Sequence, residues 1–345
     1  MNDLIEIIAG DARRTLQCID FSELRKKKIL ITGASGIIGV NLLACLRQLT
    51  ITRAYDFCVA AVMQSAPYPY LQEFCDYPNC FIFRGDITDI EFCRTLPEAD
   101  YIIHAAGYGQ PGRFMQSPVK TLQLNTASTF QLFEKLLPGG KFLFLSTSEL
   151  YSGLSHPPFT EQQIGTTTTM HSRACYIEGK RGGEAIVNAY REQGVNAKSA
   201  RLALAYGPGT RPNDLRVLNS FIQRALKGKI TLMDHGEAKR TYCYVSDAVE
   251  ILWDILFLGK GPIYNVGGNS RTTIKEMAKQ IGAFLQVPVE FPDTARPLKD
   301  SPDDVYLDMS KVQEEFHKTD YVQLDEGLAR TIRWQKALYQ SLETN

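Results

Sequence analysis

Short hydrophobic runs alternate with longer amphipathic stretches through the first 205 residues. The runs have the length of buried strands, and the stretches between them carry apolar residues at helical spacing. We expect strands in KKILIT and at 57–62, 80–83, 100–104, 141–146 and 197–203, and helices near 37–49, 88–95, 118–137 and 173–193. Strands separated by helices of this length form parallel βαβ units, so the pattern predicts an α/β fold with a Rossmann-like doubly wound parallel sheet.

The two ends of the chain depart from this alternation. Residues 1–24 predict a helical lead-in whose apolar residues Leu4, Ile7, Ile8 and Leu16 dock on a domain surface. After residue 205 a loop, YGPGTRPND, precedes shorter elements at 214–228, 230–233, 241–245, 246–258, 263–266 and 272–286. We therefore expect a Rossmann domain at 25–205, a smaller C-terminal α/β lobe at 206–345 with interleaved chain segments, and a cleft between them.

Composition narrows the class of protein. The 345 residues carry 38 basic and 38 acidic side chains, so no basic excess indicates a nucleic-acid or anionic-membrane partner. No apolar run reaches the roughly 18 residues of a membrane span. The eight cysteines form no CxxC pair, which favours free thiols in a reducing compartment over disulfides or a metal site. We expect a cytoplasmic protein without a bound metal.

A glycine-rich turn follows the first predicted strand. In ITGASGIIG, Gly33, Gly36 and Gly39 stand between an apolar strand and a helix. The diphosphate of a dinucleotide needs close approach to the backbone, and the helix N-terminus supplies N–H groups and partial positive charge. In this strand–turn–helix context the three glycines predict a dinucleotide site.

A second constellation predicts proton transfer. Tyr176 and Lys180 are four residues apart in SRACYIEGKRGGE and lie on one face of a helix. A lysine ammonium and a positive nicotinamide ring both favour the tyrosine phenolate, which then takes a hydroxyl proton while hydride leaves the same carbon. At the end of a strand, LSTSELYSG offers Thr147 as a hydrogen-bond partner for that hydroxyl and Glu149 as a proton carrier.

These motifs resemble a known superfamily. The G-x-x-G-x-x-G spacing, RGDITD (84–89) and HAAG (104–107) resemble the short-chain dehydrogenase/reductases. STSELY, RACYIEGKR and the segments 117–126, 211–228 and 239–250 resemble the extended members that act as NAD-dependent nucleotide-sugar epimerases and dehydratases. The likeness covers roughly residues 27–290 and is closest to the UDP-glucuronate decarboxylases, or UDP-xylose synthases.

The resemblance implies an enzyme, a lyase or isomerase, that uses a tightly bound NAD to oxidise C4 of a nucleotide sugar transiently. It also implies a homodimer and a C-terminal lobe that binds the substrate. The implied catalytic residues are Thr147, Ser148, Glu149, Tyr176 and Lys180, and the implied substrate-binding residues are Arg216 and Arg240. The implied cofactor-binding residues are Gly33, Ser35, Gly36, Ile37, Ile38, Gly39, Asp86, Ile87, Ala105, Ala106, Gly107, Asn125, Tyr176 and Lys180.

Several positions depart from the decarboxylase pattern. The second strand ends in Met63 and Gln64, without the acid that holds an NAD ribose and without the arginine that marks NADP. We expect NAD, with NADP not excluded. Leu204, Met233 and 166–169 differ around the substrate. Three functions remain open: UDP-glucuronate decarboxylation, nucleotide-sugar 4,6-dehydration or epimerisation, and a non-catalytic NAD(P)-binding scaffold.

Overall fold

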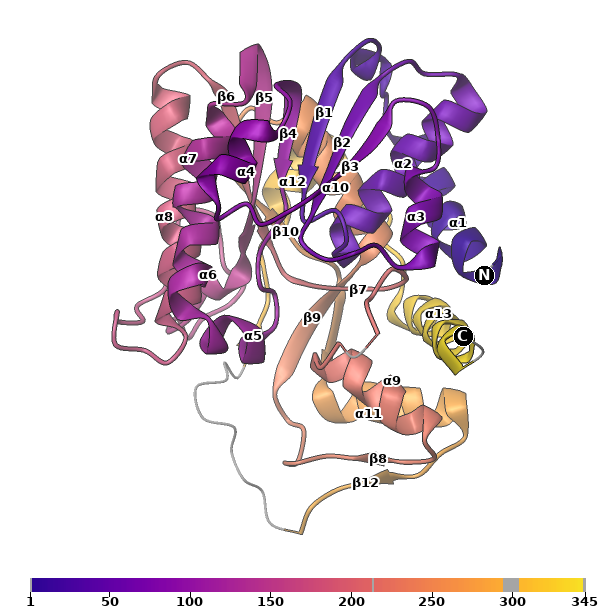
Figure 1. The fold of residues 1–345 in the computed structure, drawn as a ribbon. Coiled ribbons are helices and arrows are strands. Elements are labelled where there is room, and N and C mark those ends of the chain that lie inside the picture. Colours follow the sequence, from indigo (N-terminus) through magenta and orange to yellow (C-terminus); the bar gives the residue numbers. More distant parts are fainter. Residues whose placement is uncertain (1, 213, 294–303, 344–345) are drawn as a thin grey trace.

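The structure is a computed structural model of the chain and describes residues 2–212, 214–293 and 304–343. Its centre is a sheet of seven parallel strands in the order β10-β6-β5-β4-β1-β2-β3 (Figure 1). All six strands predicted before residue 205 lie in it, which confirms the Rossmann-like doubly wound class. The seven are β1 (Lys28–Thr32), β2 (Cys58–Met63), β3 (Cys80–Arg84), β4 (Ala99–His104), β5 (Leu136–Thr147), β6 (Asn196–Leu202) and β10 (Ile263–Val266).

Helices cover both faces of this sheet, and β1 shows why. Ile29 and Ile31 enter the hydrophobic core on one face, whereas Leu30 between them enters the core on the other. Such an uninterrupted apolar run is typical of a parallel strand that is buried on both sides. One core lies under α2 (Ile37–Arg53) and α10 (Val245–Phe257), and the other lies under α4 (Ile90–Thr95), α6 (Pro118–Asn125), α7 (Ala127–Phe133) and α8 (Ala174–Glu192).

The predicted helix over 118–137 is wrong in its extent. Two helices, α6 and α7, meet at Thr126, and β5 already begins at Leu136. The Thr126 side chain donates a hydrogen bond to the Leu122 carbonyl at 2.8 Å, a back-bond that bends helices. The break positions Asn125 at the end of α6, beside α8.

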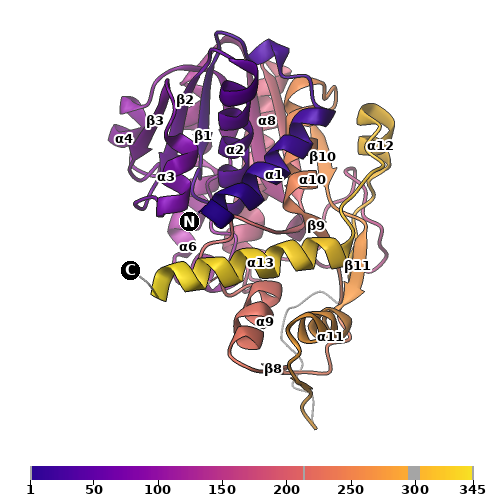
Figure 2. The same cartoon turned by 90° about the vertical axis from the view of Figure 1, so that its right-hand side faces the viewer.

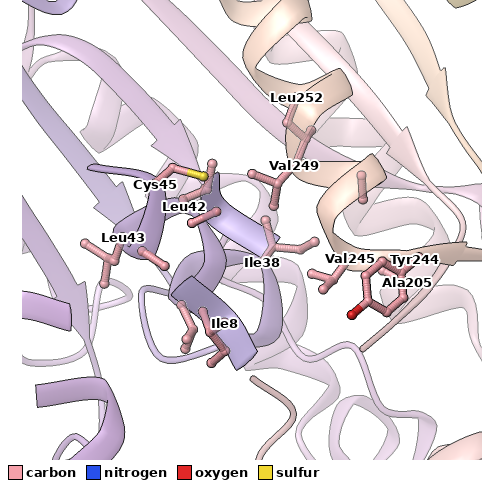
Figure 3. Close-up of a cluster of buried hydrophobic side chains, with 14 of the residues drawn as sticks. Ile8, Ile38, Leu42, Leu43, Cys45, Ala205, Tyr244, Val245, Val249 and Leu252 are labelled. Atoms are coloured by element: carbon pink, nitrogen blue, oxygen red, sulfur yellow. The ribbon is translucent and has the colours of Figure 1, made fainter. Parts of the chain in front are cut away.

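The predicted lead-in helix is confirmed as α1 (Asn2–Cys18), followed by a 3-10 turn at Ser22–Leu24. Ile8 of α1, Leu42 of α2 and Val249 of α10 belong to one buried cluster (Figure 3). Asp11 anchors the helix, because its carboxylate accepts hydrogen bonds from the Tyr244 hydroxyl at 2.7 Å and from Arg330. Burial raises the pKa of Asp11 to about 6, and these two partners oppose that rise.

The C-terminal part of the chain forms a smaller lobe below the sheet. A second, four-stranded sheet contains β7, β9, β11 and β13, and two strands, β8 and β12, form a short ribbon. The long helix α13 runs between this lobe and the large sheet (Figure 2). The remaining elements are α3 (Pro69–Cys75), α5 (Pro111–Gln116), β7 (Leu204–Tyr206), α9 (Val217–Leu226), β8 (Ile230–Thr231), β9 (Lys239–Tyr244), β11 (Ser270–Thr273), α11 (Ile274–Leu285), β12 (Val289–Glu290), β13 (Asp304–Val305), α12 (Ser310–Phe316), α13 (Leu324–Glu343) and a 3-10 turn at Ser148–Tyr151.

The lobe and the sheet share chain segments. The predicted strand over 263–266 pairs in parallel with β6 and so extends the large sheet. The helix before it, α10, also packs on that sheet. None of the helices in the described part of the chain has the length and apolar content to cross a lipid bilayer.

A buried ion pair connects the strand β6 to the helix α8. Arg201 of β6 donates to both carboxylate oxygens of Glu184 on α8, at 2.9 and 2.8 Å. Its remaining nitrogen, Nη1, donates to the Tyr151 hydroxyl and to the carbonyls of Glu161 and Gln163. One guanidinium therefore holds α8, β6, the turn after β5 and the 161–163 loop in register.

Replacing Glu184 by glutamine should lower the free energy of unfolding by about 3–5 kcal/mol, because the Arg201 charge would stay buried without its carboxylate. Urea denaturation at pH 7 measures this loss. The matched control is Glu91→Gln, which breaks the exposed pair with Arg94 and should cost less than about 1 kcal/mol. Equal losses in the two variants would contradict the anchoring role.

Candidate functional site

The candidate site lies where the strand order reverses. The chain proceeds outward from β1 to β2 and β3, then returns to the other side of β1 with β4. In such sheets, ligands bind outside the carboxyl ends of the strands at this point. Thr32 and His104 end the two strands in register, so Gly33 and Ala105 emerge next to each other.

The glycine turn has no room for side chains. Gly33 adopts φ +66°, and a Cβ on it would lie 2.6 Å from the Ala105 carbonyl oxygen. A Cβ on Gly39 would lie 2.5 Å from the Gly33 oxygen. Gly36 is the N-cap of α2, whose first N–H groups are the open donors of the turn. The arrangement fits a dinucleotide diphosphate, which needs bare backbone at a helix N-terminus.

Two neighbouring pockets open over this turn, with volumes of about 220 Å³ and 110 Å³. They share Gly33, Gly107, Tyr108, Arg113 and Arg211 in their lining, so they form one crevice with two ends. Of the predicted residues, the larger pocket is lined by Gly33, Gly36, Ile37, Ile38, Gly39, Ala105, Gly107, Tyr176, Lys180 and Arg216, and the smaller by Ser35, Asp86, Ile87, Ala106 and again Gly33 and Gly107.

A buried histidine fixes the shape of the crevice. The ring of His104 lies 3.0 Å from the Leu124 carbonyl through Nε2 and 2.8 Å from the Thr32 hydroxyl through Nδ1. Because a carbonyl only accepts, Nε2 carries the proton and the Thr32 hydroxyl donates to Nδ1. That hydroxyl in turn accepts from the Ala106 N–H at 3.2 Å. Burial lowers the pKa of His104 to about 3, so the ring is neutral.

Tyr176 lies at the start of α8 with its ring stacked on Phe114 of α5, the centroids 4.6 Å apart. The side chain of Thr147, the last residue of β5, interacts with Tyr176. Burial raises the pKa of Tyr176 to about 12, while Thr147, Arg173 and Arg216 act to lower it. The expectation that Lys180 and a positive nicotinamide ring together favour the Tyr176 phenolate stays a prediction.

Lys180 lies one turn further along α8 and is buried. Its Nζ donates to the Leu145 carbonyl at 2.6 Å and lies 4.8 Å from the Phe144 ring centroid. Burial lowers the pKa of Lys180 to about 7. Nζ would lie 3.4 Å from a Cβ on Gly107, so the ammonium points at the segment after β4. Lys180 also lines the larger pocket, together with Tyr176.

Glu149 follows Thr147 in the turn after β5. One carboxylate oxygen pairs with Arg173 at 3.0 Å, and the other, Oε2, is buried without a hydrogen-bond partner among the residues that the structure describes. Burial raises the pKa of Glu149, and Arg173, His171 and Arg240 oppose that rise. Such an orphaned oxygen beside Tyr176 is a candidate for carrying a substrate proton.

Arg216 and Arg240 approach the site from the C-terminal lobe. Arg216 lines the larger pocket and is held by Asp214, Nη2 to Oδ2 at 2.7 Å. Arg240, on β9, interacts electrostatically with Glu149 and Arg173. Ser148 is half-buried, and neither it nor Arg240 lines either pocket.

Asn125 lies outside both pockets, at the packing interface of α6 and α8. Its side-chain amide donates to the Thr121 carbonyl at 2.7 Å, and its side-chain oxygen is buried without a partner in the described part of the chain. A Cβ on Gly179 would lie 3.3 Å from that amide nitrogen. The assignment of Asn125 to cofactor binding stays a prediction.

The structure also brings in residues that the motifs did not single out. Arg173 begins the motif RACYIEGKR, three positions before Tyr176. Its place near Tyr176 could therefore have been predicted from the sequence. Phe114 and Arg113 come from the short helix α5, and Arg211 comes from the loop after β7. Arg211 begins the family-like segment 211–228, which was a weak signal for it. Nothing in the local pattern marks Phe114 and Arg113, because only the long-range packing places them at the crevice.

Comparisons with known proteins agree with this geometry. The model of the family described as "NAD dependent epimerase/dehydratase family" matches residues 29–267. A UDP-glucuronic acid decarboxylase 6 from Arabidopsis thaliana is 32% identical over 87% of this chain and 86% of its own length. A UDP-glucuronic acid decarboxylase 1 from Xenopus tropicalis is 29% identical over 91% of this chain and 73% of its own.

Solved structures share the fold. An epimerase from Methanothermobacter thermautotrophicus superposes with a TM-score of 0.82 at 22% identity, covering 98% of both chains. A dTDP-glucose 4,6-dehydratase from Streptomyces venezuelae, solved with NAD bound, has a TM-score of 0.79 at 23% identity, covering 91% of this chain and 98% of its own.

The buried His104 should make the protein sensitive to acid. Its pKa is about 3 in the folded state against an ordinary value of 6.5, so its stabilising contribution is present above pH 6.5 and lost as the pH falls toward 3. Between these limits the free energy of unfolding should fall by about 1.4 kcal/mol per pH unit from this group. Denaturant titrations from pH 7 to 4 should show a shallower slope for His104→Gln, and parallel slopes would contradict the assignment.

Replacing Tyr176 by phenylalanine should lower kcat by about 10²–10⁴-fold, because the group that takes the substrate proton is lost. Dinucleotide affinity, measured by calorimetry, should change little. Tyr190→Phe is the matched control on the same helix, where the ring stacks on Phe133 away from the crevice. Retained turnover in Tyr176→Phe would exclude this tyrosine as the base.

Proposed function

We propose that this chain, which belongs to the NAD-dependent epimerase/dehydratase family, oxidises C4 of a nucleotide sugar transiently and decarboxylates UDP-glucuronate to UDP-xylose. The observation that carries the proposal is that Tyr176, which lines the larger pocket, interacts with Thr147 and with Glu149, whose second carboxylate oxygen is buried without a partner among the described residues. The similarity to UDP-glucuronic acid decarboxylases, at 32% identity for one of them, supports the choice of substrate.

The crevice fits a nicotinamide dinucleotide, since Gly33 and Gly39 leave bare backbone for its diphosphate and Lys180 reaches toward Gly107. A bound nicotinamide would supply a reversible hydride acceptor for C4 and a positive charge that favours the Tyr176 phenolate. Tyr176 takes the proton from the sugar O4, and Thr147 holds that oxygen by a hydrogen bond. The high pKa that burial gives Tyr176 makes the phenolate a strong base once positive charge favours its formation.

Decarboxylation then needs little further catalysis. The C4 ketone lies β to the C5 carboxylate, so the C5–carboxylate bond breaks, carbon dioxide leaves and the electron pair forms a C4–C5 enolate. Protonation at C5 and return of hydride to C4 give UDP-xylose, with O4 recovering its proton from Tyr176. Atoms balance with one proton taken up and no net redox change. The protein contributes mainly by orienting the sugar.

Glu149 is the group that the proposal assigns to proton transfer at C5. Its burial favours the protonated form, which is the form that can donate. Arg240 and Arg216 are assigned to the negative charges of the substrate, the sugar carboxylate and the diphosphate. Both approach from the C-terminal lobe, so binding closes the crevice from that side.

A second candidate is 4,6-dehydration or epimerisation of a neutral nucleotide sugar. It begins with the same C4 oxidation by Tyr176, and Glu149 would then act on the C6 hydroxyl or on a neighbouring carbon. Leu204 and Met233 on the lobe side, where the decarboxylase pattern differs, favour a sugar other than glucuronate. A non-catalytic scaffold would bind dinucleotide and leave every sugar unchanged.

We also propose a homodimer that forms through α6 and α8. The two helices pack side by side, and Val119, Leu122 and Phe130 expose apolar surface on α6 and α7. Light scattering at micromolar concentration should give twice the mass of the chain, and a monomer would contradict this arrangement.

The reaction is tested by incubating the purified protein separately with UDP-glucuronate, UDP-glucose, UDP-N-acetylglucosamine, GDP-mannose, CDP-glucose and dTDP-glucose, and measuring the products by mass spectrometry. We expect a loss of about 44 mass units from UDP-glucuronate only. A loss of about 18 from a neutral hexose nucleotide would replace the decarboxylase by a dehydratase. An unchanged mass with altered NMR couplings would indicate an epimerase, and no change in any substrate would indicate the scaffold.

A further inference from the structure

The smaller pocket, at the end of β2, is unusually basic for an adenosine site. Met63 and Gln64 line it where an acid commonly binds the ribose 2′-hydroxyl. Its charged lining residues are Asp86, Arg113, Lys120 and Arg211. Asp86 is neutralised by Lys120 and further held by the Gln64 amide and by Thr88. Because Asp86 and Lys120 neutralise each other, Arg113 and Arg211 give this pocket a net positive charge.

Arg211 crosses the glycine turn from a distant part of the chain. Its Nε donates to the Ser35 carbonyl at 2.7 Å, and Nη2 donates to the Ser35 hydroxyl. Its guanidinium also interacts electrostatically with Tyr68 and Tyr70, which places it beside the segment after β2. Across the part of the chain that the structure describes, no carboxylate forms an ion pair with it, and the nearby Asp214 is bonded to Arg216.

Arg113 approaches from the opposite wall, on α5, and lines both ends of the crevice. Within the described residues it too has no carboxylate partner. Burial and repulsion from Arg113 both lower the pKa of Arg211. Two guanidinium groups held near each other without an acid between them form a site for a multiply charged anion, and guanidinium binds phosphate through two parallel hydrogen bonds.

We propose that Arg211 and Arg113 bind the 2′-phosphate of an adenosine ribose, so that the crevice takes NADP in preference to NAD. The local sequence favours NAD because no arginine follows β2 directly. In the folded chain the guanidinium groups arrive instead from the loop after β7 and from α5. The inference rests on the proposed use of a nicotinamide dinucleotide, but not on which sugar reacts.

The competing role for these arginines is binding of the diphosphate, which NAD and NADP share. Calorimetric titration separates the two roles when NADP⁺, NAD⁺, 2′,5′-ADP and 5′-ADP are compared, after the nucleotide released by denaturing the purified protein has been identified by mass. We expect NADP⁺ to bind at least about tenfold more tightly than NAD⁺. In Arg211→Ala, NADP⁺ and 2′,5′-ADP should lose about 10- to 100-fold, and NAD⁺ and 5′-ADP less than about threefold.

Three further variants test whether misfolding, rather than loss of a phosphate contact, explains the lower NADP⁺ affinity of Arg211→Ala. Arg113→Ala should show the same selective loss. Gln64→Glu, at an exposed side chain, should weaken NADP⁺ but not NAD⁺ by adding negative charge. Arg94→Ala, at an exposed arginine of α4 outside both pockets, should change neither.

Equal loss of NAD⁺ and NADP⁺ affinity in both arginine variants would overturn the proposal and assign the arginines to the diphosphate. Tighter binding of NAD⁺ than of NADP⁺ by the unaltered protein would overturn it as well. No sugar nucleotide enters these titrations, so either failure leaves the proposed decarboxylation standing. Conversely, a chain that turns over none of the six sugars could still show the predicted preference.

Discussion

The close contact between two turns is the constraint on which the rest of the molecule depends. Gly33, after β1, lies so near Ala105, after β4, that a Cβ on Gly33 would collide with the backbone at 2.6 Å. The contact exists because β1 and β4 are parallel neighbours that end in register. It brings the helix N-terminus of α2 against the segment that Lys180 faces, and it joins the two pockets into one crevice. His104 and Thr32 connect the two turns by a chain of hydrogen bonds between uncharged groups.

Burial shifts the pKa values of the titratable groups in the site, and the direction depends on the group. It raises the pKa of Tyr176 and of Glu149, and it lowers that of Lys180. The carboxyl is thereby pushed toward its protonated, donating form, while the tyrosine becomes a strong base only when positive charge is brought beside it. The Thr147 side chain acts to lower the pKa of this tyrosine, so the end of β5 and the start of α8 interact at this point.

The sequence predicts most of this architecture because the strands are buried on both faces and therefore read as continuous apolar runs, as in KILIT. It fails where local signals compete with packing. The helix over 118–137 is interrupted at Thr126, and nothing in the local helix propensity marks this position. The strand at 263–266 is recognisable, but its place beside β6 follows only from the three-dimensional path. Arg113 and Arg211 reach the crevice from segments that carry no dinucleotide motif, and the pKa of Tyr176 depends on a depth of burial that a motif cannot show.

The central claim is that C4 is oxidised and then reduced within one binding event. It is tested most directly by supplying UDP-glucuronate that carries deuterium at C4, in ordinary water, and locating the label by NMR and mass spectrometry. The account predicts UDP-xylose that retains the deuterium at C4, has ordinary hydrogen newly bound at C5, and forms over many turnovers without added reductant. The deuterated substrate should also react more slowly than the unlabelled one, because the C4–H bond is broken. Product that has lost the C4 deuterium to solvent, or decarboxylation at the same rate with and without the label, would contradict it.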